Sequence, residues 1–421
     1  MSVSKQYDVV VIGGGAGGMA AALGAYENGA KNVVLIERDV ELGGILQQCI
    51  HNGFGLHQFK EELSGPAYAE RFKKQLEKTS IEIKLDTTVT NITQDKQVHY
   101  INSYEGYQMI DAKAIVVAIG CRERNHHQIE IPGKRLAGIL TAGTAQRYLN
   151  IDGYLVGKKI FILGSGDIGL IMARRMTLEG AEVVGVAELM PYSNGLNRNI
   201  VQCLEDFNIP LYLSHTVTNI HGHDRLEGVT ISQVDENFQP IKNSEKTFAV
   251  DTLLLSVGLI PENHLLREIG VAIHPVTGGA IIDDHYQTSS AGIFTCGNSL
   301  HVHDLVDFVS QEGYQAGKFA AKHALLEQNG DQQVAITVQH PIRYSVPSFV
   351  TYDDEEYVTI KYRVAQPYEQ GKLIIKVDGE VIREMRKIDL LPAKMETIKL
   401  KKSLIFEHHQ VNELSLELEV N

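Results

Sequence analysis

Cysteine is scarce in this sequence. Its 421 residues include only four cysteines, at positions 49, 121, 203 and 296. Their wide separation excludes a disulfide framework and the CxxC spacing of zinc and iron–sulfur sites. A reducing cytoplasm is therefore the expected compartment.

Basic residues are fewer than acidic residues. Lys and Arg number 39 against 52 Asp and Glu, which gives a net charge of −13. Nucleic-acid binding needs a surface that neutralises phosphates, so no nucleic-acid partner is expected. Residues 1–7 lack the apolar core of a secretory signal, so export is not expected. Residues 9–26 are uncharged, but six of these 18 residues are glycine, which indicates a strand, a turn and a helix rather than a transmembrane segment.

A glycine-rich motif stands between a predicted strand and a predicted helix near the N-terminus. Residues 7–12 form a β-branched run, and the motif GxGxxG follows at residues 13–18. In such a motif Gly13 permits a tight turn, Gly15 lets the backbone approach a pyrophosphate, and Gly18 lets the helix pack on the strand. The pattern predicts a dinucleotide-binding unit.

The same motif occurs a second time. Residues 159–163 form an apolar strand, residues 164–169 read GSGDIG, and each motif is followed by a second strand that ends in a glutamate, Glu37 or Glu188. A carboxylate there can accept the hydroxyl protons of an adenosine ribose. From the first glycine to the glutamate the spacing is 24 residues in both copies (37 − 13 and 188 − 164). The repeat predicts two nucleotides in one chain, and electron transfer between them.

These motifs resemble the pyridine nucleotide–disulfide oxidoreductase superfamily over about residues 7–326. The resemblance implies an FAD-binding domain that is interrupted by an inserted NAD(P)H-binding domain of similar fold. Segment 292–298 is similar to the strand with which such chains return to the FAD domain, although Asn298 replaces the usual aspartate. An amide can still donate and accept hydrogen bonds, so FAD is expected.

Three further segments, 43–55, 190–192 and 297–304, resemble one branch of this superfamily. That branch contains FAD/NAD-linked subunits of bacterial multisubunit dehydrogenases, related to the flavoprotein subunits of opine and glycerol-3-phosphate dehydrogenase systems. Its members often act beside a second flavoprotein subunit. The resemblance therefore implies that the chain assembles with a partner flavoprotein or dehydrogenase subunit, with further copies of itself as a homo-oligomer, or with both.

The expected fold class is α/β, with two Rossmann-like dinucleotide-binding domains and a small C-terminal β-rich domain. The FAD-binding domain is expected at residues 1–122 and 255–328, and the NAD(H)-binding domain at residues 123–254. At residues 329–421, alternating segments and the turn pair Asp378-Gly379 predict a β-rich module. This module carries no cluster of ionisable residues, so an interface for a partner or a second copy is expected there rather than an active site.

The motifs and the resemblance together assign the cofactor-binding residues. Those expected to hold FAD are Gly13, Gly15, Ala16, Gly17, Gly18, Glu37, Arg38, Gly43, Gly44, Val89, Gly120, Gly297 and Asn298. Those expected to hold NAD(H) are Gly164, Gly166, Asp167, Ile168, Gly169, Glu188 and Gly258. The charge of Glu188 would repel the 2′-phosphate of NADPH by about 4 kcal/mol at a separation of about 4 Å. No Arg or Lys follows it before Arg198, so NADH is favoured.

The redox dithiol of this superfamily is missing. Leu46 and His51 stand at the two positions, counted from Gly44, where disulfide reductases have cysteines. Disulfide reduction is therefore not expected. Cys49 could lie near the flavin, as the single redox thiol of NADH peroxidases does, although a lone cysteine is more often an inert apolar residue.

Four side chains are candidates for catalysis: His301, Cys49, Gln48 and His51. The resemblance places His301 beside the flavin pyrimidine, where it could donate a hydrogen bond as negative charge builds on the reduced ring. The alternative is a loop histidine with ordinary hydrogen-bond partners. Gln48 and His51 lie where the superfamily chain passes the isoalloxazine, and polar filling of a loop is the alternative for them. His301 and His303 are spaced as metal ligands could be, but no third ligand is evident, so no metal is expected.

The sequence therefore predicts an FAD-dependent oxidoreductase that transfers hydride between NAD(H) and a bound flavin. Without a dithiol or a cluster, its electrons would pass to or from a partner redox protein or a small acceptor. Two alternatives stay open. One is a non-catalytic nucleotide-binding subunit of a dehydrogenase complex, and the other is an NADH oxidase or peroxidase that uses Cys49.

Overall fold

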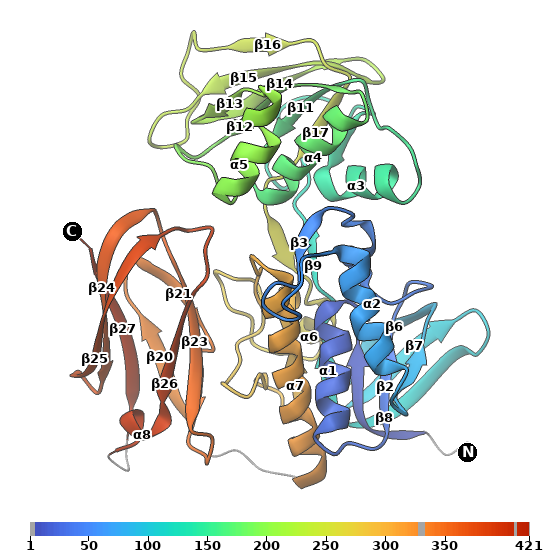
Figure 1. Ribbon diagram of the computed structural model, residues 1–421, viewed down its shortest axis with the longest axis vertical. Coiled ribbons are helices and arrows are strands. Elements are labelled where there is room, and N and C mark those ends of the chain that lie inside the picture. The colour runs from blue at the N-terminus through green and yellow to red at the C-terminus, as the bar shows by residue number, and fades with distance from the viewer. Residues whose placement is uncertain (1–4, 327–332, 408–410, 421) are drawn as a thin grey trace. The chain divides into compact units, whose positions relative to one another are not determined.

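The computed structural model of the protein describes residues 5–326, 333–407 and 411–420 (Figure 1). The chain divides into two compact units. Unit 1 contains the residues up to Cys121 and those from Pro261 onward, and unit 2 runs from Arg122 to Ile260. Unit 2 is thus inserted into unit 1. The expected boundary between residues 328 and 329 lies outside the described residues.

A seven-stranded sheet forms the centre of unit 1. Its strands are β1 (Gln6–Ile12), β2 (Val33–Ile36), β5 (Glu82–Lys84), β6 (Thr87–Ile92), β7 (Gln97–Asn102), β8 (Gly106–Val117) and β19 (Ile293–Thr295). Their order is β5-β2-β1-β8-β7-β6, and β19 also pairs with β8. The end of β8 is parallel to β1 and β19, whereas its beginning joins β7 and β6 in an antiparallel meander. Strand β1 is buried on both faces, because Val9 and Val11 pack into one core and Val10 and Ile12 into another.

Two helices lie close together on one face of this sheet: α1 (Ala16–Glu27) and α7 (Val306–Leu326). Glycine is required where they meet. A Cβ atom at Gly317 of α7 would lie 1.9 Å from the carbonyl oxygen of Ala21, and one at Gly24 of α1 would lie 2.2 Å from the carbonyl oxygen of Tyr314. This contact fixes the start of α7 beside the glycine turn that precedes α1.

Shorter elements complete this part of unit 1. They are η1 (Gly44–Gln48), β3 (Asn52–Phe54), β4 (Leu63–Ser64), α2 (Gly65–Leu76), α6 (His264–Glu268) and η3 (Gly297–Ser299). The hydroxyl of Ser64 caps α2 by accepting a hydrogen bond from the N–H of Ala67 at 3.4 Å. Among the described residues, no helix is both long enough and apolar enough to cross a membrane.

Unit 2 has a parallel sheet with helices and a separate antiparallel sheet. The parallel strands are ordered β10 (Ile139–Thr141), β17 (Thr252–Leu255), β11 (Lys159–Leu163), β12 (Glu182–Glu188) and β13 (Leu211–Leu213). The antiparallel strands are β14 (His215–Gly222), β15 (Leu226–Gln233) and β16 (Lys246–Phe248), and the helices are α3 (Ala142–Asn150), α4 (Asp167–Leu178) and α5 (Asn197–Cys203). Strands β9 (Cys121–Glu123) and β18 (Leu259–Pro261) lie where the chain passes between the units. The strand–turn–helix order predicted around both glycine motifs is confirmed.

The C-terminal residues of unit 1 form a β-sandwich. One sheet has the order β22 (Phe349–Thr351), β20 (Gln333–Val338), β27 (Glu413–Val420), β24 (Tyr368–Val377) and β25 (Glu380–Leu390). The other has the order β21 (Ile342–Val346), β23 (Tyr357–Val364) and β26 (Glu396–Lys401), which the short helix α8 (Lys402–Ile405) follows. Apolar side chains from both sheets share one core. The turn between β24 and β25 has φ values of +46° at Asp378 and +87° at Gly379, as its sequence predicts.

Ion pairs join this sandwich to the rest of unit 1. The Nζ of Lys402, a side chain that is 4% exposed, lies 2.7 Å from carboxylate oxygens of both Asp284 and Asp353. Lys318 of α7 pairs with Glu355 at 3.0 Å. Since Asp284 and Lys318 precede the sandwich in the chain, these contacts fix it on the preceding part of unit 1.

The packing of α1 against α7 can be tested by Gly317→Ala. Alanine normally favours a helix over glycine by about 1 kcal/mol. Here its Cβ would have to displace the backbone of α1, and overpacking typically costs about 1–3 kcal/mol. We expect a net loss of stability, measured as a lower midpoint of thermal unfolding of the apoprotein.

Gln315→Ala is the matched control, because Gln315 is exposed on the same helix. Its effect should stay within about 0.5 kcal/mol. Equal midpoints for the two variants would show that the helices can separate without cost.

Candidate functional site

The first glycine turn, at residues 13–18, has unfilled space beside its backbone at Gly15, which is called the open place below. Gly13 has a φ of +103°, and a Cβ atom at Gly18 would lie 1.7 Å from the carbonyl oxygen of Gly13, so both positions require glycine. A Cβ atom at Gly15, by contrast, would meet no protein atom within 4 Å. The start of α1, at Ala16 and Gly17, carries the N–H groups of a helix N-terminus, which attract anions. The open place therefore fits the pyrophosphate of a dinucleotide.

A buried glutamate holds this turn. Glu37, directly after β2, is 6% exposed. Its Oε2 accepts a hydrogen bond from the N–H of Gly14 at 2.5 Å, and its Oε1 accepts one from the N–H of Asp39 at 2.8 Å. Each carboxylate oxygen can accept one more bond, so ribose hydroxyls still have acceptors here. The neighbouring Arg38 is exposed, and its contact with FAD stays a prediction.

Unit 2 repeats this arrangement. Glu188, the last residue of β12, is 5% exposed and accepts hydrogen bonds from the N–H groups of Ser165 and Met190, both at 2.9 Å. These donors lie one residue after the first motif glycine and two residues after the glutamate, as Gly14 and Asp39 do in unit 1. One feature differs, because the hydroxyl of Ser165 also donates to Oε2 of Glu188 at 2.6 Å.

The other NAD(H) candidates surround the second turn. Gly164 has a φ of +97°, and a Cβ atom there would lie 2.1 Å from the carbonyl oxygen of Ser256. The N–H of Gly169 donates to the hydroxyl of Ser256 at 3.1 Å. The carboxylate of Asp167 accepts hydrogen bonds from the N–H of Leu196 at 2.8 Å and the side chain of Asn199 at 2.7 Å, so it fixes α5. Contacts of Gly166, Asp167, Ile168 and Gly258 with a nucleotide stay predictions.

In unit 1 the glycine pair Gly43-Gly44 packs on the first glycine turn. The N–H of Gly43 donates to the carbonyl oxygen of Gly14 at 2.9 Å, and a Cβ atom at Gly44 would lie 3.3 Å from the Cα of Gly15. The side chain of Gln47 donates to the carbonyl oxygen of Leu42 at 2.7 Å and so holds the approach to this pair. The structure thus brings Gly43 and Gly44 to the open place beside Gly15.

The return segment lies at the same place. A Cβ atom at Gly17 would be 3.7 Å from the Sγ of Cys296, which precedes Gly297. Asn298 is the half-exposed residue of this buried segment, and its Oδ1 accepts a hydrogen bond from the N–H of His303 at 3.0 Å. That bond leaves its NH₂ group free to donate toward a cofactor. Two remaining candidates, Gly120 and Val89, lie after β8 and on β6, and their contacts with FAD stay predictions.

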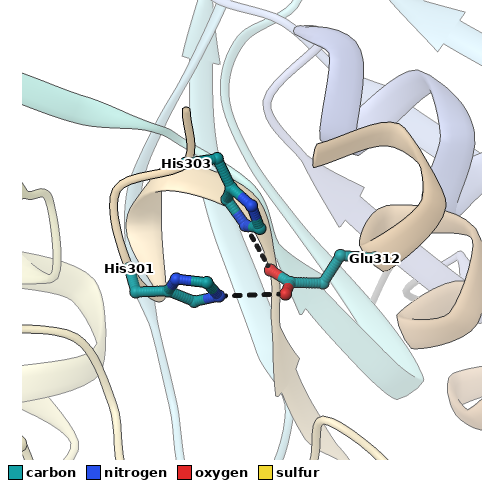
Figure 2. Close-up of side chains that lie close together, drawn as sticks. All are labelled: His301, His303 and Glu312. Carbon is teal, nitrogen blue, oxygen red and sulfur yellow. Dashed lines mark hydrogen bonds and ion pairs between the residues drawn. The ribbon is translucent and has the colours of Figure 1, made fainter. Parts of the chain in front are cut away.

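The structure supplies a partner for the two histidines that the sequence did not indicate. Figure 2 shows His301 and His303 on one loop and Glu312 on α7, with both rings directed at the carboxylate. The Nε2 atoms of His301 and His303 lie 3.1 Å from Oε2 and Oε1 of Glu312, respectively. Glu312 is thus a third side chain of a type that can ligate a metal, and the sequence did not reveal it. The expectation that no metal binds here stays a prediction. The sequence did not reveal Glu312 because it lies nine residues beyond His303, on a helix whose buried face carries mostly small residues.

Burial keeps these histidines neutral. It lowers the pKa of His301 and lowers the pKa of His303 to about 3. Side chains of His301 and Glu312 are 0% exposed, and that of His303 is 2% exposed. His301 is therefore enclosed by protein and bound to Glu312. Its predicted hydrogen bond to the flavin stays a prediction. The structure also connects His301 to Gly297, since both bind the carboxylate of Glu312.

The loop with the other catalytic candidates is partly buried. Gln48 is 8% exposed, and the ring of His51 packs on Phe54 at a centroid distance of 4.9 Å. Burial raises the pKa of the Cys49 thiol to about 12. A redox thiol reacts as the thiolate, so this environment opposes the peroxidase alternative. The catalytic roles of Gln48, Cys49 and His51 stay predictions.

The chain matches one family model over most of its length. Residues 7–323 match the pyridine nucleotide-disulphide oxidoreductase family. The chain belongs to this family. It is accordingly an FAD-dependent oxidoreductase, and a pyridine nucleotide is the second cofactor of the family.

Two curated relatives are components of bacterial enzymes. The chain is 24% identical over 338 residues to hydrogen cyanide synthase subunit HcnB of Pseudomonas protegens, and the match covers 75% of this chain and 69% of that protein. It is also 24% identical over 351 residues to an opine oxidase subunit of Agrobacterium tumefaciens, and this match covers 77% of this chain and 66% of that protein.

Solved structures share the fold. Thioredoxin reductase of T. acidophilum matches with a TM-score of 0.63 and 22% identity, over 76% of this chain and 99% of that one. A NAD-dependent persulfide reductase of A. fulgidus matches with a TM-score of 0.57 and 18% identity, over 88% of this chain and 67% of that one. These neighbours confirm the α/β fold class with Rossmann-like domains.

The fit of FAD to the first turn can be tested by Gly15→Val. Gly15 has a φ of −73°, which valine can adopt, and the space around it is open. The variant should fold normally but place its side chain where a pyrophosphate would lie. We expect FAD affinity of the reconstituted apoprotein to fall at least about tenfold, or about 1.4 kcal/mol.

Gly166→Val places the same change at the equivalent position of unit 2 and should leave FAD affinity unchanged. Equal losses of FAD from both variants would contradict the assignment of FAD to the first turn.

The role of Cys49 can be tested by Cys49→Ser. Because its thiol stays protonated near pH 7, we expect the variant to oxidise NADH in the presence of peroxide at the same rate as the wild type. Rates would be compared at equal flavin content. Loss of peroxide-dependent turnover in the variant would restore the peroxidase alternative.

Proposed function

We propose that the protein transfers hydride between NAD(H), held by unit 2, and FAD, held by unit 1. Its electrons then pass to or from a partner redox protein or a small acceptor, in the cytoplasm. The observation that carries this proposal is the matched pair of sites, in which Glu37 and Glu188 bind backbone N–H groups at identical offsets. A chain that binds two dinucleotides needs a turn of this kind for each of them.

In this proposal the residues of unit 1 bind FAD and orient it. The open backbone at Gly15 and the start of α1 accept the pyrophosphate, and Glu37 accepts the ribose hydroxyls while it holds the turn. The NH₂ group of Asn298 donates toward the cofactor. When bound, FAD supplies the capacity to take a hydride from a nicotinamide and to release electrons to another redox group.

The residues of unit 2 select the nucleotide. Oε2 of Glu188 already accepts two hydrogen bonds from Ser165, whereas Oε1 accepts one, from Met190. Oε1 can thus accept a ribose hydroxyl, and its charge opposes a 2′-phosphate. No basic residue stands between Glu188 and Arg198, so NADH is the proposed nucleotide.

The route of the electrons beyond the flavin leads to another molecule. Leu46 and His51 occupy the positions where disulfide reductases of the family have their dithiol, and the Cys49 thiol is poorly ionised. Both curated relatives, HcnB and the opine oxidase component, are named as subunits of larger enzymes. A partner flavoprotein or dehydrogenase subunit is therefore the proposed electron donor or acceptor.

The proposal is tested by anaerobic titration of the FAD-loaded protein with NADH and with NADPH. NADH should bleach the visible flavin absorbance at lower concentration than NADPH. Glu188→Gln removes the charge and keeps one acceptor, so it should reduce this preference at least about tenfold, because one charge pair contributes up to about 4 kcal/mol.

Glu182→Gln serves as the control, since Glu182 begins the same strand and its side chain is 59% exposed. Its nucleotide preference should equal that of the wild type. A flavin that keeps its absorbance with either nucleotide would support the non-catalytic subunit instead.

A further inference from the structure

The sandwich reaches into the loop that carries Asn298 and His301. On β23 the side chains alternate: Tyr362 and Val364 lie in the core of the sandwich, whereas Lys361 and Arg363 lie on the opposite face. Both cations are only 13% exposed. Residues outside the sandwich therefore cover these two side chains.

Lys361 is paired with the carboxylate that binds the two histidines. Its Nζ lies 2.5 Å from Oε2 of Glu312. The same carboxylate accepts a hydrogen bond through Oε1 from the N–H of Gly297, at 2.7 Å. Together with His301 and His303, four donors thus surround one fully buried acceptor.

Arg363 holds the next part of the same loop. Its guanidinium donates to the carboxylate of Asp304 and, at 3.1 Å, to the carbonyl oxygen of Val302. The other oxygen of Asp304 accepts a hydrogen bond from the N–H of Met395 at 2.6 Å. The sandwich therefore holds residues 297–304 in two ways. Lys361 binds Glu312, which accepts from Gly297, and Arg363 binds Asp304 directly.

The charges of this cluster balance only when Lys361 is present. Burial by itself would raise the pKa of Glu312, but Lys361 and the histidines hold it well below its usual range. Because burial keeps His301 and His303 neutral, Lys361 is the cation that compensates the charge of Glu312. A buried carboxylate without a cation would be strongly disfavoured and would rearrange its neighbours.

We propose that Lys361 is a positioning residue of the flavin site, which the C-terminal sandwich inserts into the FAD-binding part to hold the Gly297–Asn298 turn through Glu312. The proposal rests on the proposed contact of Asn298 with FAD. It gives the sandwich a role within its own chain, beside the role of partner interface that its sequence suggests.

A divalent metal at His301, His303 and Glu312 is the competing explanation of the cluster. The ligand atoms of these three residues lie within 4.8 Å of one another. However, Lys361 already occupies Oε2 of the carboxylate, and its ammonium would repel a cation at this place. The geometry therefore favours the ion pair.

The test is the affinity of the full-length apoprotein for FAD, with no nicotinamide nucleotide added. Lys361→Met should weaken FAD binding at least tenfold at pH 8, whereas Lys361→Arg should bind nearly as the wild type does. Lys318→Met is the matched control, since Lys318 forms another ion pair between α7 and the sandwich, with Glu355. It should leave FAD affinity unchanged.

The pH dependence separates positioning from a general loss of stability. Without Lys361, burial raises the pKa of Glu312, so the cluster can lose its uncompensated charge by taking up a proton. FAD affinity of Lys361→Met should therefore recover as the pH is lowered from 8 to 6, whereas that of the wild type should stay flat. The titratable or charged groups that act on Glu312 are His301, His303, Lys361, Tyr286 and Cys296, and Arg363 acts on His301. The control Lys318→Met keeps Lys361, so its FAD affinity should not recover in this way.

The double variant Lys361→Met/Glu312→Gln covers the case in which the single variant folds poorly. It removes both charges and keeps an acceptor for Gly297, so FAD affinity should return to within about threefold of the wild type. Equal FAD affinity of Lys361→Met and wild type at pH 8 would overturn the proposal. So would stoichiometric binding of Zn²⁺ to the wild type that is lost in His303→Gln. Because FAD binding is measured alone, a failure of hydride transfer from NADH would leave this result unaffected.

Discussion

The structure of each nucleotide site depends on one contact, in which a buried glutamate accepts a hydrogen bond from the backbone N–H that follows the first motif glycine. In unit 1 this contact joins Glu37 to Gly14, and in unit 2 it joins Glu188 to Ser165. The carboxylate fixes the turn, and the turn determines where the next helix begins. In unit 1 the open space beside Gly15 follows from this constraint, as does the position of α1 against α7.

The contact also has a chemical consequence. A carboxylate that is already bound to two backbone donors cannot rotate freely, so its remaining acceptor positions face a fixed direction and are pre-organised for a ribose. The two glutamates differ in one hydrogen bond. The hydroxyl of Ser165 occupies an acceptor position on Glu188, whereas the corresponding position on Glu37 stays available. Glu188 therefore offers a ribose one acceptor position fewer than Glu37, which suits the weaker, exchangeable binding proposed for a nicotinamide nucleotide in unit 2.

The C-terminal sandwich belongs to the same compact unit as the FAD-binding part. Three of its cations, Lys361, Arg363 and Lys402, each pair with a carboxylate that precedes the sandwich in the chain. All three are nearly buried, so their charges are compensated by these partners and not by water. Surfaces of the sandwich that are not used in this way remain available for a partner protein of the kind proposed above.

Most of the local structure follows from the sequence. Both glycine turns, strand β1 and the hairpin at Asp378-Gly379 lie where the sequence predicts them, because each depends on residues that are close neighbours in the chain. The equal spacing of Glu37 and Glu188 from their motifs also predicted two similar units, but it did not show that each glutamate binds a backbone N–H of its own turn.

The partners of buried polar groups were decided only by the tertiary structure. Sequence spacing indicated that His301 and His303 lie together, but not that Glu312 and Lys361 complete their cluster. Likewise it did not show that Asp167 binds the start of α5. Such contacts join residues of separate elements, and a buried charge selects its partner by which groups the packed backbone brings within a few ångströms. That selection leaves no periodic pattern along the chain, and so the sequence alone determined the turns, whereas the packed fold determined the charge network.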